Sequence, residues 1–92
     1  MKYKTEDKIN GYSVRVEVEW DNVIKKIRIT GDFFAYPESV IEKIEEKLAG
    51  LSAEAWESSL LSRINDAIEE EKGRLVGISM MDISKLVKRA VS

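Results

Sequence analysis

Residues 12–20 read Tyr-Ser-Val-Arg-Val-Glu-Val-Glu-Trp, and apolar and polar side chains alternate through this stretch without interruption. Successive side chains of a β-strand point to opposite faces, so a repeat of two residues indicates a strand with one buried and one exposed face. The valines are β-branched and favour the extended conformation. The predicted inner face carries Tyr12, Val14, Val16, Val18 and Trp20.

Two short turns connect this strand to a neighbour on each side. Asp21-Asn22 tolerates the positive φ angles of a tight hairpin, and residues 23–30 follow as a second strand with Ile27 and Ile29 on the inner face. Asn10-Gly11 is a strong hairpin signal that links the first strand to residues 2–9. The first third of the chain therefore predicts a three-stranded antiparallel β-meander with one apolar face.

The meander leads into an aromatic connection, Ile29-Thr30-Gly31-Asp32-Phe33-Phe34-Ala35-Tyr36-Pro37. This connection contains both phenylalanines, one of the three tyrosines and the single proline of the chain. Gly31 and Asp32 are residues typical of a turn. Neither a strand nor a helix period accounts for the aromatic side chains. They either plug the end of the core or contact a partner, because exposed aromatic patches commonly mark interfaces.

Three amphipathic segments follow, and they predict helices that cover the apolar face of the meander. The first begins with Pro37 in its first turn and ends at Gly50. Residues 53–72, with Ser52 as N-cap and Gly73 as the end, form either one helix or a short turn and a longer helix divided at Ser58-Ser59. Residues 75–78 are predicted to be an apolar connector. Ser79 and Asp82 then resemble a capping box for the last helix.

Strands followed by helices predict an α+β fold for residues 1–92, taken as a single domain. Its two layers are the N-terminal antiparallel sheet and about three C-terminal helices. Trp20 and Trp56 both fall on predicted apolar faces, so we expect them to pack in the core. We expect the same of Met80 and Met81.

The composition excludes several classes of function. The 92 residues include no cysteine and no histidine, so thiolate chemistry and the commonest metal ligand and general base are absent. Glu17 and Glu19 lie on the solvent face of a strand, and no glycine-rich phosphate loop is present. We therefore predict no catalytic, cofactor-binding or metal-binding residue. The net charge is −2, and neither basic end is dense enough to indicate a nucleic-acid partner. No apolar run approaches the roughly 18 residues that span a bilayer, so we predict no membrane association and, by default, a cytoplasmic location.

The chain resembles a known family in its aromatic connection. Gly31-Asp32-Phe33-Phe34 followed by Tyr36-Pro37-Glu38 comes after a β-hairpin and before an acidic helix, and Gly77-Ile78-Ser79 precedes a final helix with basic residues near its end. On these residues the chain resembles the small C-terminal accessory domain of lipoate–protein ligases. In that family the domain is either fused behind the catalytic domain or is a separate subunit. A 92-residue chain beginning at Met1 resembles the separate subunit of archaeal bipartite ligases.

The resemblance implies a SufE/NifU-like fold, like that of iron–sulfur scaffold and sulfur-acceptor proteins. It implies a non-catalytic accessory subunit that forms a heterodimer with the large catalytic subunit of a lipoate–protein ligase. The large subunit would bind ATP and lipoate, make lipoyl-adenylate, and transfer the lipoyl group to a lysine of an acceptor domain. The small subunit would bind no cofactor, would be required for adenylation, and would shift position during the cycle. Whether lipoate or octanoate is preferred stays open.

The candidate residues for the partner interface are Gly31, Asp32, Phe33, Phe34, Tyr36 and Pro37. One alternative function is a stand-alone protein-binding module unrelated to lipoylation. Another is an enzyme that works through glutamate or tyrosine side chains.

Overall fold

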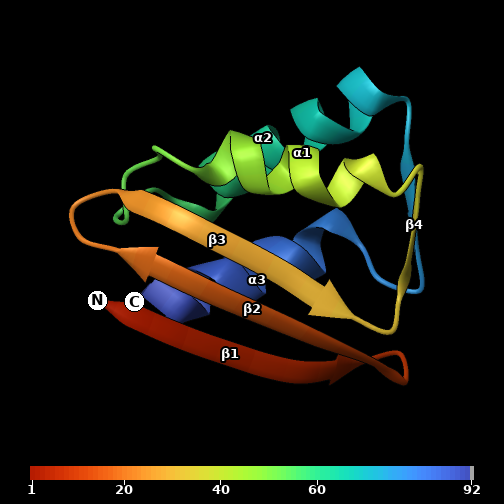
Figure 1. The fold of residues 1–92 in the computed structure, drawn as a ribbon, viewed down its shortest axis with the longest axis horizontal. Helices are drawn as coiled ribbons and strands as arrows, with labels where there is room; N and C mark the ends of the chain where they lie inside the picture. Colours follow the sequence, from red (N-terminus) through yellow and green to blue (C-terminus); the bar gives the residue numbers. More distant parts are fainter. Residues whose placement is uncertain (92) are drawn as a thin grey trace.

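The computed structural model describes residues 1–91 of the chain. Figure 1 shows a sheet with helices behind it and along its upper edge, and a short pair of strands at the end of the molecule away from the N-terminus. In chain order the elements are β1 (Lys2–Ile9), β2 (Tyr12–Trp20), β3 (Ile24–Gly31), β4 (Phe34–Tyr36), α1 (Ser39–Leu48), α2 (Glu57–Glu71), β5 (Arg74–Val76) and α3 (Met80–Val91).

The main sheet has the order β1-β2-β3 and is antiparallel throughout, as the sequence predicts. Its inner face is buried at Val14, Val16, Val18, Ile27 and Ile29. An irregularity between Glu19 and Trp20 shifts the register at the end of β2, and this also brings Ile24 into the core. Trp20 is half-buried against that core.

The outer face of the main sheet is polar, and its cross-strand pairs join opposite charges. The pairs are Lys2–Glu19, Lys4–Glu17, Glu6–Arg15, Glu17–Arg28 and Glu19–Lys26. Arg15 and Glu6 form an ion pair at 3.2 Å between Nη2 and Oε2. The alternation in residues 12–20 therefore separates a buried apolar face from a solvated face of complementary charges.

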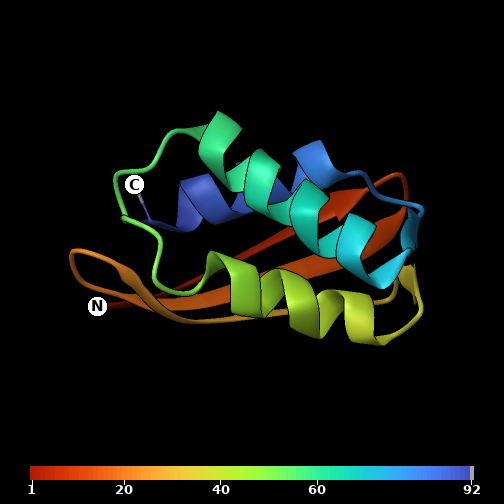
Figure 2. The ribbon, with the colours of Figure 1, turned by 90° about the horizontal axis from the view of Figure 1, so that it is seen from above.

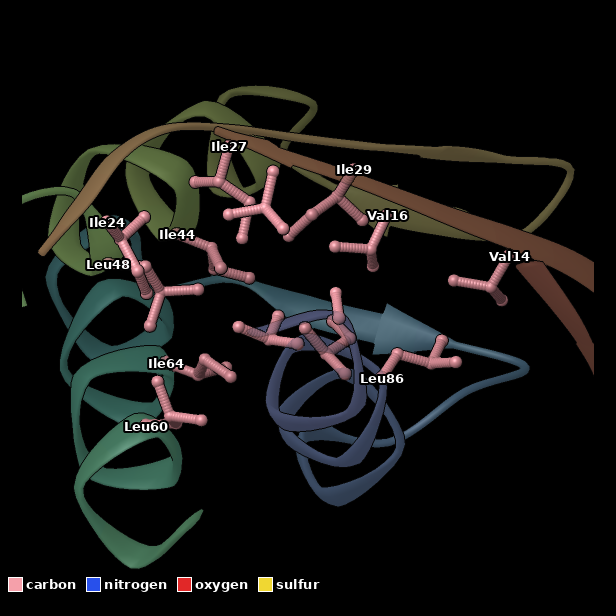
Figure 3. Packing of buried hydrophobic residues seen from close by; sticks show 14 of the residues in the cluster. Val14, Val16, Ile24, Ile27, Ile29, Ile44, Leu48, Leu60, Ile64 and Leu86 are labelled. Atoms are coloured by element: carbon pink, nitrogen blue, oxygen red, sulfur yellow. The ribbon is translucent and has the colours of Figure 1, made fainter. Parts of the chain in front are cut away.

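The helices cover only the inner face (Figure 2). Helix α1 packs against β3, α3 packs against β1 and β2, and α2 packs against both α1 and α3. Figure 3 shows Val16 and Ile29 of the sheet facing Ile44 and Leu86 of the helices across one apolar core. The arrangement confirms the predicted α+β, two-layer fold.

The ends of the helices follow the sequence signals in part. Ser79 and Asp82 form the predicted capping box, with Ser79 N–H donating to Asp82 Oδ2 at 2.8 Å and Asp82 N–H donating to Ser79 Oγ at 3.2 Å. Gly50 follows α1 with a φ of +89°. The prediction for Pro37 is wrong by two residues: α1 begins at Ser39, and Pro37 precedes it with its carbonyl accepting from Val40 N–H.

The region between α1 and α2 differs from the prediction. Of the two alternatives for residues 53–72, the structure has the short turn followed by a longer helix, Glu57–Glu71. The predicted division at Ser58-Ser59 is wrong, because both residues lie within this helix. Ser52 does not cap that helix; its Oγ accepts from Glu54 N–H within a turn, at 3.1 Å. Trp56 has an extended backbone at the N-cap and is 80% exposed, so its predicted place in the core is wrong. Because the helix begins after Trp56, this side chain does not share the apolar stripe of α2.

Two segments predicted to be connections contain strands. Residues 34–36 form β4 and residues 74–76 form β5, and the two pair in a separate antiparallel sheet. A strand of three residues is too short to show a period, and its pairing partner is distant in the sequence. At the start of α3, Met80 packs against the core as predicted, whereas Met81 is 53% exposed.

Candidate functional site

The candidate site is the antiparallel pair β4–β5, which we call the ribbon. Phe34 lies opposite Val76, Ala35 opposite Leu75, and Tyr36 opposite Arg74. Because side chains alternate along a strand, the middle pair and the outer pairs lie on opposite faces of the ribbon. Ala35 and Leu75 pack against the hydrophobic core.

The outer face of the ribbon is an exposed apolar patch. Phe34 is 66% exposed, Tyr36 is 72% exposed and Val76 is 43% exposed, and Arg74 lies beside them on the surface. Aromatic residues and arginine are the residue types most enriched in protein–protein interfaces. The sequence therefore pointed to Phe34 and Tyr36, but it did not identify Arg74 and Val76.

The sequence carries only a weak signal for β5. Gly73 and Gly77 bracket Arg74-Leu75-Val76, in which exposed, half-buried and exposed residues alternate. Three residues are too few to separate a strand from an apolar connector by periodicity.

Two of the candidate residues hold the ribbon in place. Asp32 Oδ1 accepts from Ser13 N–H at 2.6 Å, and Asp32 N–H donates to Ser13 O at 3.1 Å. A Cβ on Gly31 would lie 2.2 Å from the same Ser13 oxygen, so only glycine allows the chain to approach β2 this closely. Gly31 and Asp32 thus anchor the start of β4 to the main sheet.

The second strand of the ribbon is anchored in a similar way. A Cβ on Gly73 would lie 2.2 Å from Val40 Cγ2 and 2.8 Å from Tyr36 O. Gly77 has a φ of +95° and lies against the ring of Tyr12. Asn10 Nδ2 donates to Gly77 O at 3.1 Å. The ribbon is therefore a preformed surface, fixed to the body of the molecule at both strands.

The remaining candidates lie on the inner side of this surface. Phe33 is half-buried against the core, and Pro37 precedes α1 after a cis peptide bond with Tyr36. Phe33 and Phe34 line a shallow hollow beside the ribbon together with Glu38 and Ile41. Phe33 therefore seals the core, while Phe34 and Tyr36 are available to another molecule.

Titratable groups with displaced pKa values lie outside the ribbon. The pKa of Asp21 is lowered because its carboxylate accepts from Val23 N–H and from Lys25. The pKa of Glu70 is lowered by its hydrogen bond with Lys47, whose own pKa is raised. Both pairs are exposed ion pairs, so neither marks an acid–base site on the ribbon.

Within residues 1–91, no group of three or more aspartate, glutamate, histidine or cysteine residues is placed to hold a metal ion. None of the helices described in this range is long and apolar enough to cross a membrane. The chemistry that the ribbon offers is apolar and aromatic contact with an arginine at its margin.

Comparison with known proteins gives a curated relative and a solved structure. Lipoate-protein ligase A subunit 2 of Thermoplasma acidophilum is 38% identical to the chain over 71 residues, which are 76% of this chain and 67% of that protein. A solved structure from the same organism, described as a bi-partite lipoate protein ligase and its E2 lipoyl domain, contains a chain with a TM-score of 0.79 and 30% identity. The alignment covers 95% of this chain and 94% of that chain. No protein-family model matches the chain.

Proposed function

The chain belongs to the lipoate-protein ligase A subunit 2 family, and from this premise we propose that it is the accessory subunit of a bipartite lipoate–protein ligase. The observation that carries the proposal is the ribbon. It presents an exposed aromatic face on a preformed support, in a chain that is similar over almost its whole length to one from such a ligase.

In this proposal the chain is not an enzyme by itself. A large catalytic subunit binds ATP and lipoate, and this chain binds neither. The chain completes the state of the large subunit that forms lipoyl-adenylate. Its composition agrees with such a division of labour, because the chain contains no cysteine and no histidine that could act as nucleophile or general base.

The proposed mechanism is closure over the active site of the large subunit. Phe34, Tyr36 and Val76 would pack against the rim of that site and exclude water from it. Excluding water strengthens the electrostatic interactions within the site and protects a reactive mixed anhydride from hydrolysis. A surface that is already held in place loses little conformational entropy on docking, which favours this role for the ribbon.

The first experiment measures lipoyl-adenylate formation by the cognate large subunit with and without this chain. We expect the rate to rise strongly when the chain is added. Parallel assays with octanoate show which acyl group the complex prefers. Equal rates with and without the chain would contradict the proposal and favour a protein-binding module unrelated to lipoylation.

The second experiment tests the ribbon itself with the double variant Phe34→Ala and Tyr36→Ala. We expect this variant to fold normally, because both side chains are largely exposed, and to lose most of its support of adenylation. Trp56→Ala is a matched control, because Trp56 is at least as exposed but lies at the N-terminus of α2, outside the ribbon. Full support by the double variant would show that the ribbon does not contact the large subunit.

A further inference from the structure

The two edges of the main sheet differ in whether their outward backbone groups have hydrogen-bond partners. The edge of β3 is covered by the segment after α1: Ile24 N–H donates to Leu51 O at 2.8 Å, and Gly50 N–H donates to Ile24 O at 2.7 Å. Farther along the same edge, Ile29 N–H donates to Glu45 Oε2 at 2.8 Å. Backbone groups at both of these places are thus satisfied by the rest of the chain.

The edge of β1 is open. Met1 and Trp20 exchange two hydrogen bonds, with Trp20 N–H donating to Met1 O at 2.8 Å and the Met1 amino group donating to Trp20 O at 2.6 Å. Bonded pairs alternate along an antiparallel ladder, so Tyr3 and Thr5 also bond to β2, whereas the backbone groups of the residues between them point away from it. The outward residues are Lys2, Lys4 and Glu6.

No neighbour within residues 1–91 accepts or donates hydrogen bonds at these outward backbone groups. Lys8 N–H donates to Asp7 Oδ1 at 2.8 Å, which closes the end of the edge near the hairpin. The open part therefore runs from Lys2 to Glu6. Its register with β2 has no irregularity, and it contains no proline. A regular unpaired edge is the structural feature to which an added strand binds.

A buried hydroxyl lies in the middle of the same strand. Thr5 is 6% exposed, and its Oγ1 has no hydrogen-bond partner among the described residues. The backbone N–H and C=O of Thr5 point toward β2. An antiparallel strand added at the open edge would therefore place a residue opposite Thr5 in a pair that lacks backbone hydrogen bonds, and the side chains of such a pair lie close together. A hydroxyl or amide side chain opposite Thr5 would then be near enough to pair with it.

The charges on the outer face define the chemistry of an added strand. In the existing pairs of that face, Lys2, Lys4 and Glu6 of the open part each lie opposite a charge of the other sign on β2, as Lys4 does with Glu17. A strand added at the open edge continues this pattern if its side chains place carboxylates opposite Lys2 and Lys4 and a cation opposite Glu6. Like charges directly opposite one another would destabilise the pairing.

We propose that β1 binds a β-strand of the large catalytic subunit by strand addition, which extends the main sheet by one strand. The inference rests on the proposed function, because that function supplies the partner. A second copy of this chain fits less well. Antiparallel self-pairing centred on Thr5 places Lys4 opposite Glu6 but also places Lys2 opposite Lys8, so repulsion offsets attraction.

Amide hydrogen exchange tests the proposal directly. The ¹⁵N-labelled chain is compared by NMR, free and in complex with the cognate large subunit. We expect exchange at Lys2, Lys4 and Glu6 to slow by about tenfold or more in the complex, since these amides gain partners. Tyr3 and Thr5 serve as internal references, because they already bond to β2. Equally fast exchange at the outward amides in both states overturns the proposal, as does concentration-dependent protection in the free chain, which indicates self-pairing.

The variant Lys4→Pro provides a second test. Proline removes the outward N–H of Lys4 and leaves the bonds to β2 intact, because proline is tolerated where the N–H of an edge strand faces solvent. We expect its affinity for the large subunit to fall roughly tenfold or more. The matched control Lys4→Thr keeps the N–H, and we expect its affinity to stay within about threefold of the unmodified chain. Unchanged affinity of Lys4→Pro overturns the proposal.

The two proposals fail in distinguishable ways. If Lys4→Pro does not fold, as judged by circular dichroism, the exchange measurement on the unmodified chain decides. If the large subunit binds and forms lipoyl-adenylate while the outward amides stay unprotected, strand addition is wrong and the accessory function stands. If the large subunit does not bind the chain at all, both proposals are wrong.

Discussion

The main sheet and the ribbon each leave one face to solvent, and the two faces differ in how their side chains are paired. On the main sheet, charged side chains lie opposite charges of the other sign, as Glu17 does with Arg28. On the ribbon, Phe34 lies opposite Val76, and the apolar surface of both stays exposed. The charges of the first face are paired within the chain. The apolar area of the second face is removed from water, with a favourable change in free energy, only when another molecule covers it.

Exposure alone therefore does not distinguish the main sheet from the face that we propose for docking. The main sheet exposes more residues, but its outer face needs no partner beyond water. The ribbon exposes few residues, yet glycine contacts and the Asp32–Ser13 hydrogen bonds hold them in one arrangement. A preformed apolar surface on a small chain is the combination that we interpret as a docking site.

The largest expected effect concerns the attachment of the ribbon. In Gly73→Ala the new Cβ would lie 2.2 Å from Val40 Cγ2 and 2.8 Å from Tyr36 O. We expect the free energy of unfolding to fall by about 2–3 kcal/mol, because a well-packed site must expand to accept a methyl group. Urea unfolding followed by circular dichroism measures this change.

Gly50→Ala is the control for that measurement. Gly50 has a φ of +89°, and a Cβ at this position would meet nothing within 4 Å, so only backbone strain of about 1 kcal/mol is expected. Equal losses in the two variants would mean that the ribbon yields to the new methyl group and is not rigidly attached.

The next effect separates the two phenylalanines. Phe33→Ala should lower the free energy of unfolding by about 1–2 kcal/mol, less than for a fully buried ring, because Phe33 is only half-buried. Phe34→Ala should change it by no more than about 0.5 kcal/mol, since Phe34 is 66% exposed. Thermal unfolding of both variants makes the comparison. A larger loss for Phe34→Ala would contradict the division into a core residue and a contact residue.

A smaller effect is expected on the outer face of the main sheet. Glu17→Lys places a cation between Lys4 and Arg28, which flank Glu17 on the two neighbouring strands. We expect a loss of about 0.5–1 kcal/mol in the free energy of unfolding, and a smaller loss at high salt. Glu17→Gln is the control, because it removes the charge without adding repulsion. If Glu17→Lys is as stable as Glu17→Gln at low salt, like charges opposite one another cost nothing on this face. If Glu17→Gln is as stable as the unmodified chain, the complementary pairs contribute nothing.

The smallest effect is a pH dependence at the Lys47–Glu70 ion pair, which joins α1 to α2. The pKa of Glu70 is lowered in the folded chain by its hydrogen bond with Lys47. Its stabilisation is therefore present above the unfolded pKa, near the ordinary value of 4.5, and is lost as the pH falls through the folded pKa. We expect the unfolding midpoint of the unmodified chain to fall more steeply below that pH than the midpoint of Glu70→Gln. If the midpoints of the two proteins change with pH in parallel, the Lys47–Glu70 pair does not contribute to the pH dependence of stability.

Much of the fold could be predicted because its signals are local. Alternation in residues 12–20 predicts β2 and its buried face, and Asn10-Gly11 predicts the hairpin to β1. The capping box at Ser79 and Asp82 predicts the start of α3. The prediction for Trp56 is wrong because an apolar residue one position before a helix continues the helical spacing in the sequence without belonging to the helix.

The candidate site could be predicted only in part. Phe34 and Tyr36 stand out in the sequence because no period explains them. Arg74 and Val76 do not stand out, and Gly31 and Asp32 resemble an ordinary turn. The anchoring of the ribbon depends on Ser13 and Val40, which belong to other elements of the fold.

By itself the sequence determined the antiparallel main sheet, the amphipathic helices and the apolar core, because each depends on the spacing of neighbouring residues. Only the tertiary structure decided that residues 34–36 pair with residues 74–76, which of the aromatic side chains stay exposed, and which edge of the main sheet stays open. These features depend on contacts between segments far apart in the chain. The free energy of such contacts is set by which surfaces the folded core brings together and which it leaves to solvent.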